Sequence, residues 1–409
     1  MDISEANSAE FKKFVQDHLQ DDPALLLFKY QGKVPFDLKM AVHQISARQK
    51  ASKRLPSWSN NPSLLFPASL ALEQSSSEET AKFKAEGLEG KNMIDLTGGL
   101  GVDFFYLSQG FEKGIYCERQ AELFRISKYN LEQLELSKDS EGLKDLGGKF
   151  EFVEGDGLEF LEKTDTQFDL IYADPARRGA GNQKLYKLQD CEPDVVSNWT
   201  LLTSKSEQIL IKASPMLDIS QAWKELTNIQ KVTIISVKNE VKELLLHWKK
   251  GSISNRQSIE VVDLGRESQQ FSFEREEEEQ ADANYSEPER YLIEPLSGIL
   301  KSGAFNLFGE RFGLKKLEKN SHLYTGNRVP IDIPGRTFEV IQEVNLKKQE
   351  IRKLFPSGKV NVITRNYVLG ADSLKKKMGL KDGGDDFLIA TKTMKGYKAF
   401  WCKKKSEGM

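Results

Sequence analysis

The chain has 409 residues, a formal net charge of -2 and 39% hydrophobic side chains, the composition of a folded protein with room for several domains. No apolar run reaches the roughly 18–20 residues that a membrane span needs, and the acidic N-terminus lacks a signal-peptide core. Three scattered cysteines, Cys117, Cys191 and Cys402, exclude a disulfide framework and a zinc site. We therefore predict a cytoplasmic protein with no bound metal.

The first 58 residues are predicted to form a helical segment. Residues 39–50 give one helix with basic side chains near its end, and prolines then mark a connecting stretch. An earlier helix is indicated by apolar residues that recur at helical spacing, namely Phe11, Phe14, Val15 and Leu19.

Residues 59–265 alternate between short apolar runs and helical stretches such as 118–134 and 220–226. This alternation predicts an α/β domain with a parallel, doubly wound, Rossmann-like sheet of seven strands. The predicted strands are residues 92–96, 114–117, 150–153, 168–173, 208–213, 232–237 and 258–264.

The C-terminal third is predicted to hold two small α+β units. Residues 265–284 are polar and are predicted to form a linker or a long hairpin. A unit at 285–335 begins with the apolar run 291–295, and a last unit at 336–409 shows the order βαβαββ.

The end of the chain is basic. Residues 342–409 carry sixteen Lys or Arg against seven Asp or Glu, and Arg365 with Tyr367 and the run Lys375–Lys377 place basic side chains near an aromatic one. That combination favours RNA as a partner. A solvated lysine-rich surface and a protein-docking module are the alternatives.

A glycine-rich loop after an apolar run is the first functional signal. Asp95 ends the run, and Thr97, Gly98, Gly99 and Gly101 follow it. Glycines let the backbone turn sharply and approach a ligand, and the helix that follows can present free N–H groups. The loop is therefore predicted to bind a cofactor at the carboxyl end of a buried strand.

Acidic residues follow the next two predicted strands. Glu118 is placed to accept both ribose hydroxyls, and Asp156, beside Gly157, is placed to accept from an adenine amino group. A dinucleotide fingerprint needs a glycine where this chain has Phe104, and Asp103 would repel a pyrophosphate. These residues favour S-adenosylmethionine, which has no phosphate, over NAD. A purely structural turn stays open as an alternative.

A second loop, Asp174-Pro175, follows the fourth predicted strand. Proline stiffens the turn and removes a donor, so the Asp174 carboxylate can accept from a substrate amine. Catalysis would then rest mainly on positioning for in-line attack on the methyl group. Arg177 and Arg178 could stack on a base or hold a phosphate, or could pair with local acids.

Residues 57–264 resemble a class I S-adenosylmethionine-dependent methyltransferase, with Thr97 at the first of three alternating glycine positions. The close succession of the last two predicted strands matches the methyltransferase form of the sheet. Residues 74–78 could cover the methionine end of the cofactor, or could be a helix N-terminus capped by Ser76 or Ser77.

The whole chain resembles a family of bacterial class I methyltransferases that has a ferredoxin-like insert and a C-terminal THUMP-like domain. THUMP domains generally bind structured RNA, so the resemblance implies an rRNA or tRNA substrate. The stretches that carry it are residues 72–78, 95–101, 173–178, 291–295, 304–314, 361–367 and 383–385.

The Asp174-Pro175 loop also resembles the Asp-Pro-Pro-aromatic motif of amino-directed nucleic-acid methyltransferases, which implies transfer to a base nitrogen. Ala176-Arg177 replaces Pro-aromatic, so the ring that would stack on a flipped base is missing at that position. Tyr186 is a candidate source of such a ring.

Other chemistries stay open. Lys212, with Asp174 and Glu240, partly resembles the lysine-aspartate-lysine-glutamate set of ribose 2′-hydroxyl methyltransferases, although the first lysine has no clear counterpart. A cysteine nucleophile for pyrimidine C5 is disfavoured because Cys191 lies outside both strand ends. A small-molecule or protein methyltransferase with a docking domain, and an inactive RNA-binding protein, are further alternatives.

Overall fold

The computed structural model describes residues 2–67, 69–139, 148–177, 187–252, 256–265 and 268–405. The chain divides into two compact units, residues 1–229 with 245–253 and residues 230–244 with 254–409. The predicted domain boundaries at residues 58, 265 and 335 stay predictions. Within the described ranges, no helix is long and apolar enough to cross a membrane.

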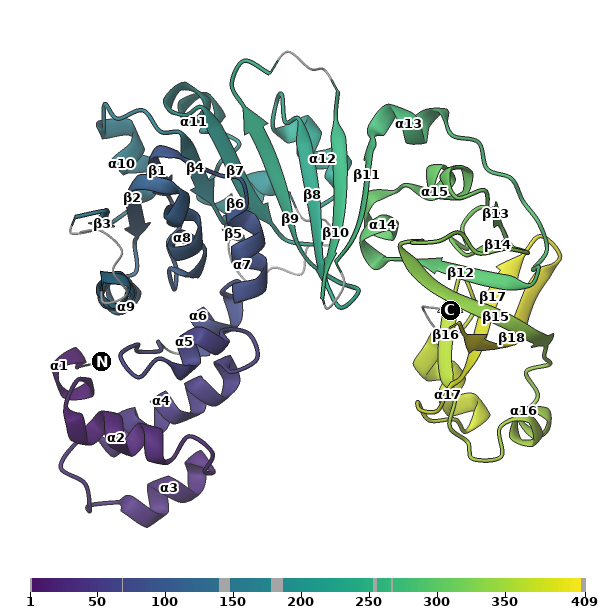
Figure 1. Cartoon of the computed structure of the whole chain (residues 1–409), viewed down its shortest axis with the longest axis horizontal. Coiled ribbons are helices and arrows are strands. Elements are labelled where there is room, and N and C mark those ends of the chain that lie inside the picture. The colour runs from purple at the N-terminus through teal and green to yellow at the C-terminus, as the bar shows by residue number, and fades with distance from the viewer. Residues whose placement is uncertain are drawn as a thin grey trace. The chain divides into compact units, whose positions relative to one another are not determined.

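Short helices open the first unit, and several begin at an aspartate or serine that caps them. Asp22 and Asp37 accept backbone N–H bonds at the starts of α3 and α4, and Ser77 does so at α7. Phe11 and Ile45 share one buried core, and α4 confirms the helix predicted at 39–50. Figure 1 shows α1 to α4 in purple around the N-terminus. The helices are α1 (Ile3–Ala6), α2 (Ala9–Asp17), α3 (Pro23–Tyr30), α4 (Leu38–Ala51), α5 (Pro56–Asn60), α6 (Ser69–Gln74) and α7 (Glu78–Ala85).

Among the described residues, nine strands form the large sheet, in the order β11-β10-β8-β9-β7-β4-β1-β2-β3. The pairs β1–β2, β1–β4, β2–β3, β4–β7 and β8–β10 are parallel, which confirms the predicted α/β, Rossmann-like fold class. The strands are β1 (Gly90–Asp95), β2 (Phe111–Glu118), β3 (Phe150–Glu154), β4 (Leu170–Ala173), β7 (Gln208–Ala213), β8 (Lys231–Val237), β9 (Glu240–Lys249), β10 (Ser258–Leu264) and β11 (Gln269–Glu274).

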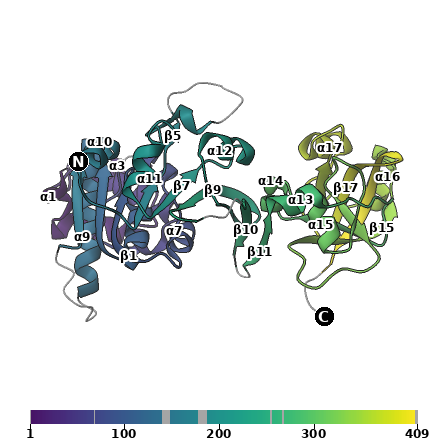
Figure 2. The ribbon, with the colours of Figure 1, turned by 90° about the horizontal axis from the view of Figure 1, so that it is seen from above.

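Helices connect the strands of the first unit, and the longest, α9, runs beside them in Figure 2. All four residues of β4 are buried, as expected for a parallel strand covered on both faces. The connecting elements are α8 (Val102–Leu107), η1 (Ser108–Gly110), α9 (Ala121–Asp139), α10 (Gly157–Lys163), β5 (Ala176–Arg177), η2 (Leu188–Asp190), β6 (Cys191–Glu192), α11 (Trp199–Lys205) and α12 (Ile219–Glu225).

The sheet departs from the predicted seven strands at β9, which lies between β7 and β8. Lys238 and Asn239 have φ values of 53° and 62°, the backbone of the type I′ turn that joins hairpin strands. The prediction missed β9 because its first residues, 240–243, are mostly charged and its continuous apolar run is only the three leucines at 244–246. The closely spaced last pair of a seven-strand sheet is therefore β8–β9, and β10 and β11 extend the sheet.

β10 and β11 pair antiparallel, which confirms the hairpin alternative for the polar stretch 265–284. The acidic run after β11 is not a linker but forms the short helix α13 (Arg275–Gln280). Its start is a capping box, in which Glu274 and Glu277 satisfy each other's backbone N–H groups.

The second unit also holds a seven-stranded sheet, in the order β13-β14-β12-β15-β18-β17-β16. α16 and α17 cover one face, where Ile351 and Leu374 pack with Leu388 and Ala399 (Figure 2). The predicted order βαβαββ for the last segment is confirmed. The elements are β12 (Tyr291–Pro295), α14 (Ser297–Ser302), α15 (Phe305–Arg311), β13 (Lys315–Lys316), β14 (Tyr324–Gly326), β15 (Gly335–Glu343), α16 (Lys348–Leu354), β16 (Asn361–Arg365), α17 (Ala371–Met378), β17 (Asp386–Thr393) and β18 (Gly396–Lys404).

Candidate active site

The glycine loop leaves β1, a central strand of the sheet, and its shape requires glycine at defined positions. A Cβ on Gly98 would lie 2.2 Å from the Tyr116 ring, so no side chain fits between the loop and β2. Gly99 and Gly101 have φ values of 58° and 83°, in the left-handed region that favours glycine. The loop is thus a backbone surface pressed against β2.

Hydrogen bonds hold this backbone in place. Gly98 N donates to the Cys117 carbonyl at 2.8 Å, and Gly101 N donates to the Gly98 carbonyl at 2.9 Å. Gly99 N donates to Glu118 Oε2 at 2.9 Å. The structure therefore brings the predicted loop and the predicted ribose acceptor Glu118 into direct contact.

Asp95, at the end of β1, is 1% exposed and accepts from Thr97 N at 2.9 Å and Thr97 Oγ1 at 3.1 Å. Burial raises the pKa of Asp95 to about 8, with the negative charges of Asp103 and Asp174 acting in the same direction. Thr97 Oγ1 also accepts from Asp174 N at 2.7 Å. The Thr97 hydroxyl therefore joins the glycine loop to the Asp-Pro loop.

The two acids after β2 and β3 are both tied to backbone. Glu118 accepts from Gly99 N with one oxygen and from Gln120 N with the other, at 2.7 Å, and carboxylate oxygens keep further acceptor capacity. Asp156 caps α10, because its Oδ1 accepts from the first N–H groups of that helix. A Cβ on Gly157 would lie 2.6 Å from the Leu96 carbonyl, so this glycine lets α10 approach the end of β1.

Asp174 follows β4 with a side chain that is 37% exposed. Its Oδ2 lies 2.5 Å from Lys212 Nζ, at the end of the adjacent strand β7. Pro175 is buried, and Arg177 lies opposite Cys191 in the β5–β6 pair. The predicted catalytic residues Asp174, Pro175 and Lys212 thus meet at one edge of the sheet. Arg178 and Tyr186 lie outside the described residues.

A buried cluster behind Asp174 was not predicted from the sequence. Lys84 Nζ, on α7, lies 2.8 Å from Asp103 Oδ1 and donates to Ser76 Oγ at 2.8 Å. Asp103 Oδ2 accepts from Ser76 Oγ and from Tyr172 OH, each at 2.7 Å. Lys212 Nζ is 3.8 Å from the same oxygen. The cluster therefore connects α7, the glycine-loop helix, β4 and β7.

The sequence signals for this cluster were weak. In the sequence, Asp103 indicates only a group that repels phosphate, and Ser76 indicates only a helix cap or a cover for the cofactor. The cap of α7 is Ser77, whose Oγ accepts from Thr80 N at 3.2 Å, and Ser76 instead turns inward to the cluster.

Comparison with known proteins identifies the family. Family models for a ferredoxin-like domain and a THUMP domain-like region match residues 291–334 and 335–404. The crystal structure of a proposed methyltransferase from Porphyromonas gingivalis W83 is 30% identical, covers 97% of this chain and 98% of that chain, and has a TM-score of 0.84. An uncharacterized S-adenosylmethionine-dependent methyltransferase of Mycobacterium tuberculosis is 20% identical over 316 residues, 76% of this chain and 80% of that protein.

This chain belongs to that family of bacterial class I S-adenosylmethionine-dependent methyltransferases with ferredoxin-like and THUMP-like domains. The loop of the methyltransferase fits its cofactor. S-adenosylmethionine, when bound, supplies an electrophilic methyl group on a sulfonium. Asp103 is a buried carboxylate in the helix that follows the loop, where it suits a cationic sulfonium and ammonium and would oppose a pyrophosphate.

The set expected of a 2′-hydroxyl methyltransferase is only partly assembled. Asp174 and Lys212 are in contact, whereas Glu240 is 75% exposed and pairs with Lys242 at 2.7 Å on its own strand. Lys84 supplies a second lysine, but its side chain is 0% exposed and pairs with Asp103. It therefore lies behind the reaction centre rather than on its open side.

In the second unit, two of the basic residues predicted to bind RNA already pair with carboxylates of the same chain. Arg365 Nε donates to the buried carboxylate of Glu294 at 2.9 Å. Lys375 lies within 2.8 Å of one aspartate and 2.6 Å of another. Lys376 and Lys377, on the same helix, are exposed. The exposed lysines of α17 are therefore better placed for a polyanion than Arg365.

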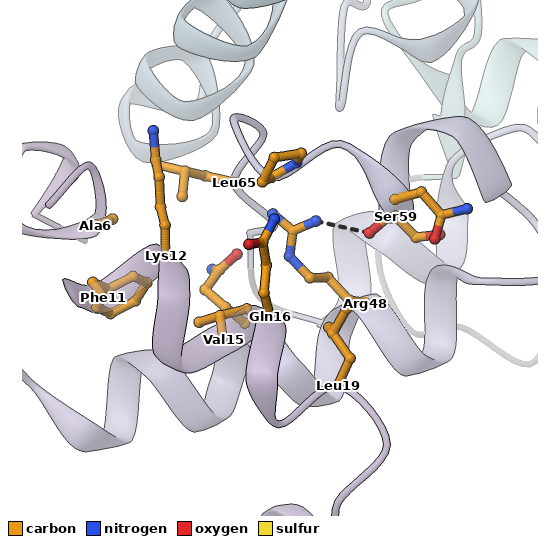
Figure 3. A pocket seen from close by; sticks show the side chains of 12 residues that line it. Ala6, Phe11, Lys12, Val15, Gln16, Leu19, Arg48, Ser59 and Leu65 are labelled. Atoms are coloured by element: carbon orange, nitrogen blue, oxygen red, sulfur yellow. Dashed lines mark hydrogen bonds between the residues drawn. The ribbon is translucent and has the colours of Figure 1, made fainter. Parts of the chain in front are cut away.

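A cavity of about 50 Å³ lies among the N-terminal helices, lined by Phe11, Val15 and Arg48 among others (Figure 3). Arg48 donates through Nη1 to the carbonyls of Ser59 at 2.8 Å and Asn61 at 2.9 Å. Burial lowers the pKa of Arg48 to about 10. The cavity has room for a few water molecules but not for a nucleoside, so it is a packing defect beside a structural arginine.

Proposed function

We propose that the methyltransferase transfers a methyl group to a base nitrogen of rRNA or tRNA, with Asp174 as the acceptor of the target N–H. The observation that carries this proposal is the state of the Asp174 carboxylate. Lys212 holds Oδ2 at 2.5 Å and Thr97 holds the backbone N–H, while the side chain is 37% exposed. Among the described residues, Oδ1 has no hydrogen-bond partner and is left to accept from a substrate amine.

The neighbouring residues support this role. Pro175 places no N–H donor beside the carboxylate, so the loop offers acceptors to the target nitrogen. The side chain of Arg177 lies outside the described part of the structure, so its contact with a base or a phosphate stays a prediction. Catalysis would rest on positioning the nitrogen for in-line attack, which is worth several orders of magnitude in rate when the geometry is right.

The cofactor would lie on the backbone of the glycine loop. Glu118 is proposed to accept the ribose hydroxyls with the acceptor capacity that its two backbone bonds leave. Asp156 is proposed to accept from the adenine amino group. The full set of proposed cofactor residues is Asp95, Thr97, Gly98, Gly99, Gly101, Glu118, Asp156, Gly157 and Asp174.

RNA is the proposed partner of the second unit. Residues 342–409 carry a net charge of +9, and the THUMP-like match covers residues 335–404. Lys376 and Lys377 are exposed on one turn of α17. A lysine that pairs with no carboxylate of its own chain can bind a phosphate, and this binding releases counterions from the RNA.

A second candidate is transfer to a ribose 2′-hydroxyl. The 2.5 Å contact between Lys212 and Asp174 favours it, because a lysine beside the acceptor stabilises a deprotonated hydroxyl. The other two members of the lysine-aspartate-lysine-glutamate set are not in place. Glu240 pairs with Lys242, and Lys84 is buried against Asp103.

The test of function is nucleoside mass spectrometry of rRNA and tRNA from cells that lack the gene. Complementation with the intact gene should restore one methylated nucleoside, and an Asp174→Ala gene should not. Asp165→Asn, an exposed aspartate in the loop before β4, is the matched control and should restore it. The product identifies base or ribose methylation directly, and an unchanged RNA profile would point to a small molecule or a protein substrate.

The RNA partner is tested with the full-length protein on immobilised total RNA. Lys376→Glu/Lys377→Glu should weaken retention and reduce the slope of affinity against salt concentration by roughly one to two units. Lys33→Glu/Lys53→Glu makes the same charge change at exposed residues of the first unit and serves as the control. Equal retention of both variants would count against α17 as an RNA contact.

A further inference from the structure

Lys84 is a buried cation that the proposed function does not use. Its side chain is 0% exposed, and its Nζ lies 2.8 Å from both Asp103 Oδ1 and Ser76 Oγ. A buried ammonium is costly unless it is paired and hydrogen-bonded. A hydrophobic residue of similar volume would serve the packing of α7 at lower cost, so the charge calls for an explanation beyond packing.

Asp103 is held as a carboxylate at the centre of the cluster. Burial alone would raise its pKa, but Lys84, Lys212 and the hydrogen bond from Ser76 lower the pKa of Asp103 to about 2. Its Oδ2 also accepts from Tyr172 OH at 2.7 Å. These contacts keep the Asp103 carboxyl ionised at neutral pH and fix it in position.

Lys212 lies between two carboxylates. Its Nζ is 3.8 Å from Asp103 Oδ2 and 2.5 Å from Asp174 Oδ2, and its side chain is 12% exposed. Lys84, Asp103, Lys212 and Asp174 thus form a row of alternating charge. The row begins with a fully buried ammonium and ends with a carboxylate that is 37% exposed at the proposed reaction centre.

We propose that Lys84 and Asp103 are positioning residues for methyl transfer, which fix Lys212 and, through it, the rotation of the Asp174 carboxylate. Asp103 holds the Lys212 ammonium from behind, so that Lys212 meets only Oδ2 of Asp174. Oδ1 is then presented to the acceptor in one orientation. The inference rests on the proposed role of Asp174, but the Lys84–Asp103–Lys212 geometry can be tested without any substrate.

The decisive variant is Lys84→Met/Asp103→Asn, which removes both charges and keeps both shapes. Asparagine still accepts from Tyr172 and Ser76, and methionine fills the space of the lysine stem, so the first unit should fold. The first measurement is the rate at which acetic anhydride acylates Lys212 in the full-length protein, read by mass spectrometry against exposed Lys33. We expect the Lys212 rate to rise about threefold, because the ammonium loses the attraction of the Asp103 carboxylate, while the loss of the Lys84 ammonium, a like charge, offsets part of that gain.

The second measurement is methyl transfer from S-adenosylmethionine to total RNA from cells that lack the gene. We expect kcat to fall about 10- to 100-fold, with KM for the cofactor within about threefold, because a small displacement of a positioned group costs that much. Asp165→Asn, an exposed aspartate in the loop before β4, is the control and should change kcat less than threefold. A purely structural role predicts the reverse, with the folded double variant as active as the wild type.

The outcomes separate the two claims. A folded double variant with unchanged Lys212 acylation and unchanged kcat overturns the positioning role. If the wild type transfers no methyl to RNA, the proposed function fails, and Lys212 acylation still decides the geometry. If the double variant does not fold, Tyr172→Phe is the second test, because it removes one hydrogen bond that fixes Asp103 Oδ2 without stranding a buried charge. The positioning role then requires kcat to fall at least threefold, and an unchanged kcat contradicts the proposal.

Discussion

Each unit of the methyltransferase contains one buried carboxylate between two cations, and the two clusters differ in their access to water. In the first unit, Asp103 lies between two lysines whose side chains are 0% and 12% exposed. In the second unit, Glu294 lies between two arginines that are 38% and 37% exposed. The cluster around Asp103 is therefore shielded from water, and we call it the dry cluster. The cluster around Glu294 is partly exposed to water, and we call it the hydrated cluster.

The two clusters also differ in what they connect. Arg336 and Arg365 join β12 to β15 and β16, and both guanidinium groups end on Glu294. The cluster around Asp103 extends further, because Lys212 also donates a hydrogen bond to Asp174 at the carboxyl end of β4. The comparison indicates that the hydrated cluster ties strands together, whereas the dry one also holds Asp174, the proposed acceptor of the target N–H.

The largest effect should come from removing one charge of the dry cluster. Lys84→Met leaves Asp103 buried with Lys212 at 3.8 Å as its remaining cation, and breaking a buried pair on one side costs about 3–5 kcal/mol. Urea unfolding of the first unit, followed by circular dichroism, measures it. Lys84→Met/Asp103→Asn should recover most of the loss. A single variant as stable as the wild type would show that the pair contributes nothing to folding.

Asp95 differs from both clusters, because it is a buried carboxyl group that pairs with no cation among the described residues. Its folded pKa of about 8 lies above the ordinary aspartate value of 3.8, so between those values the unfolded chain ionises while the folded chain stays protonated. Stability from this group is complete below pH 3.8, falls by at most about 1.4 kcal/mol per pH unit as pH rises, and levels off above about 8. Asp95→Asn should remove that slope.

The measurement for Asp95 is the free energy of unfolding in urea at pH 5.5, 7 and 8.5 for the wild type and Asp95→Asn. The variant should gain relative to the wild type as pH rises. Asp169→Asn is not a suitable control, because Asp169 accepts two backbone bonds, so exposed Asp165→Asn is used instead. A constant difference between variant and wild type across the three pH values would contradict the assignment of a protonated Asp95.

In the hydrated cluster, Glu294→Gln should cost about 1.5–3 kcal/mol, the range for one hydrogen bond to a charged group. The arginines lose a carboxylate, but each can turn its exposed part to water, so no charge is stranded. Thermal unfolding of the second unit measures the loss. If Glu294→Gln lowered the free energy of unfolding as much as Lys84→Met does, the partial exposure of the arginines would not reduce the cost. The contrast between the two clusters would then be wrong.

Much of the fold was predictable because its signals are local. The strands β7, β10 and β12 fall on the residues predicted, since each is a short apolar run. The glycine loop and Glu118 were predictable for the same reason, and the structure brings them into contact. The strand β9 was missed because the charged residues at its start hide its short apolar run.

The cluster around Asp103 could not be predicted in this way. In the sequence, Lys84 is one of several charged residues on a polar helix. Only the packing of α7 shows that its side chain is buried. Its partners Ser76 and Asp103 are 27 residues apart, and Tyr172 is 69 residues from Asp103. Arg365 was predicted to face RNA, but its partner Glu294 is 71 residues away. Residue type indicates that such a group needs a partner, and only tertiary structure shows which one.

The smallest effect belongs to an ion pair that is exposed on both sides. Arg290 and Glu339 lie 3.0 Å apart in the second unit, with side chains that are 62% and 42% exposed. Glu339→Gln should cost no more than about 0.5 kcal/mol, and 1 M NaCl should erase the difference by screening. The same salt should leave the cost of Lys84→Met almost unchanged, because a dry pair is not screened. If both costs fell alike in salt, burial would not be what separates the two clusters.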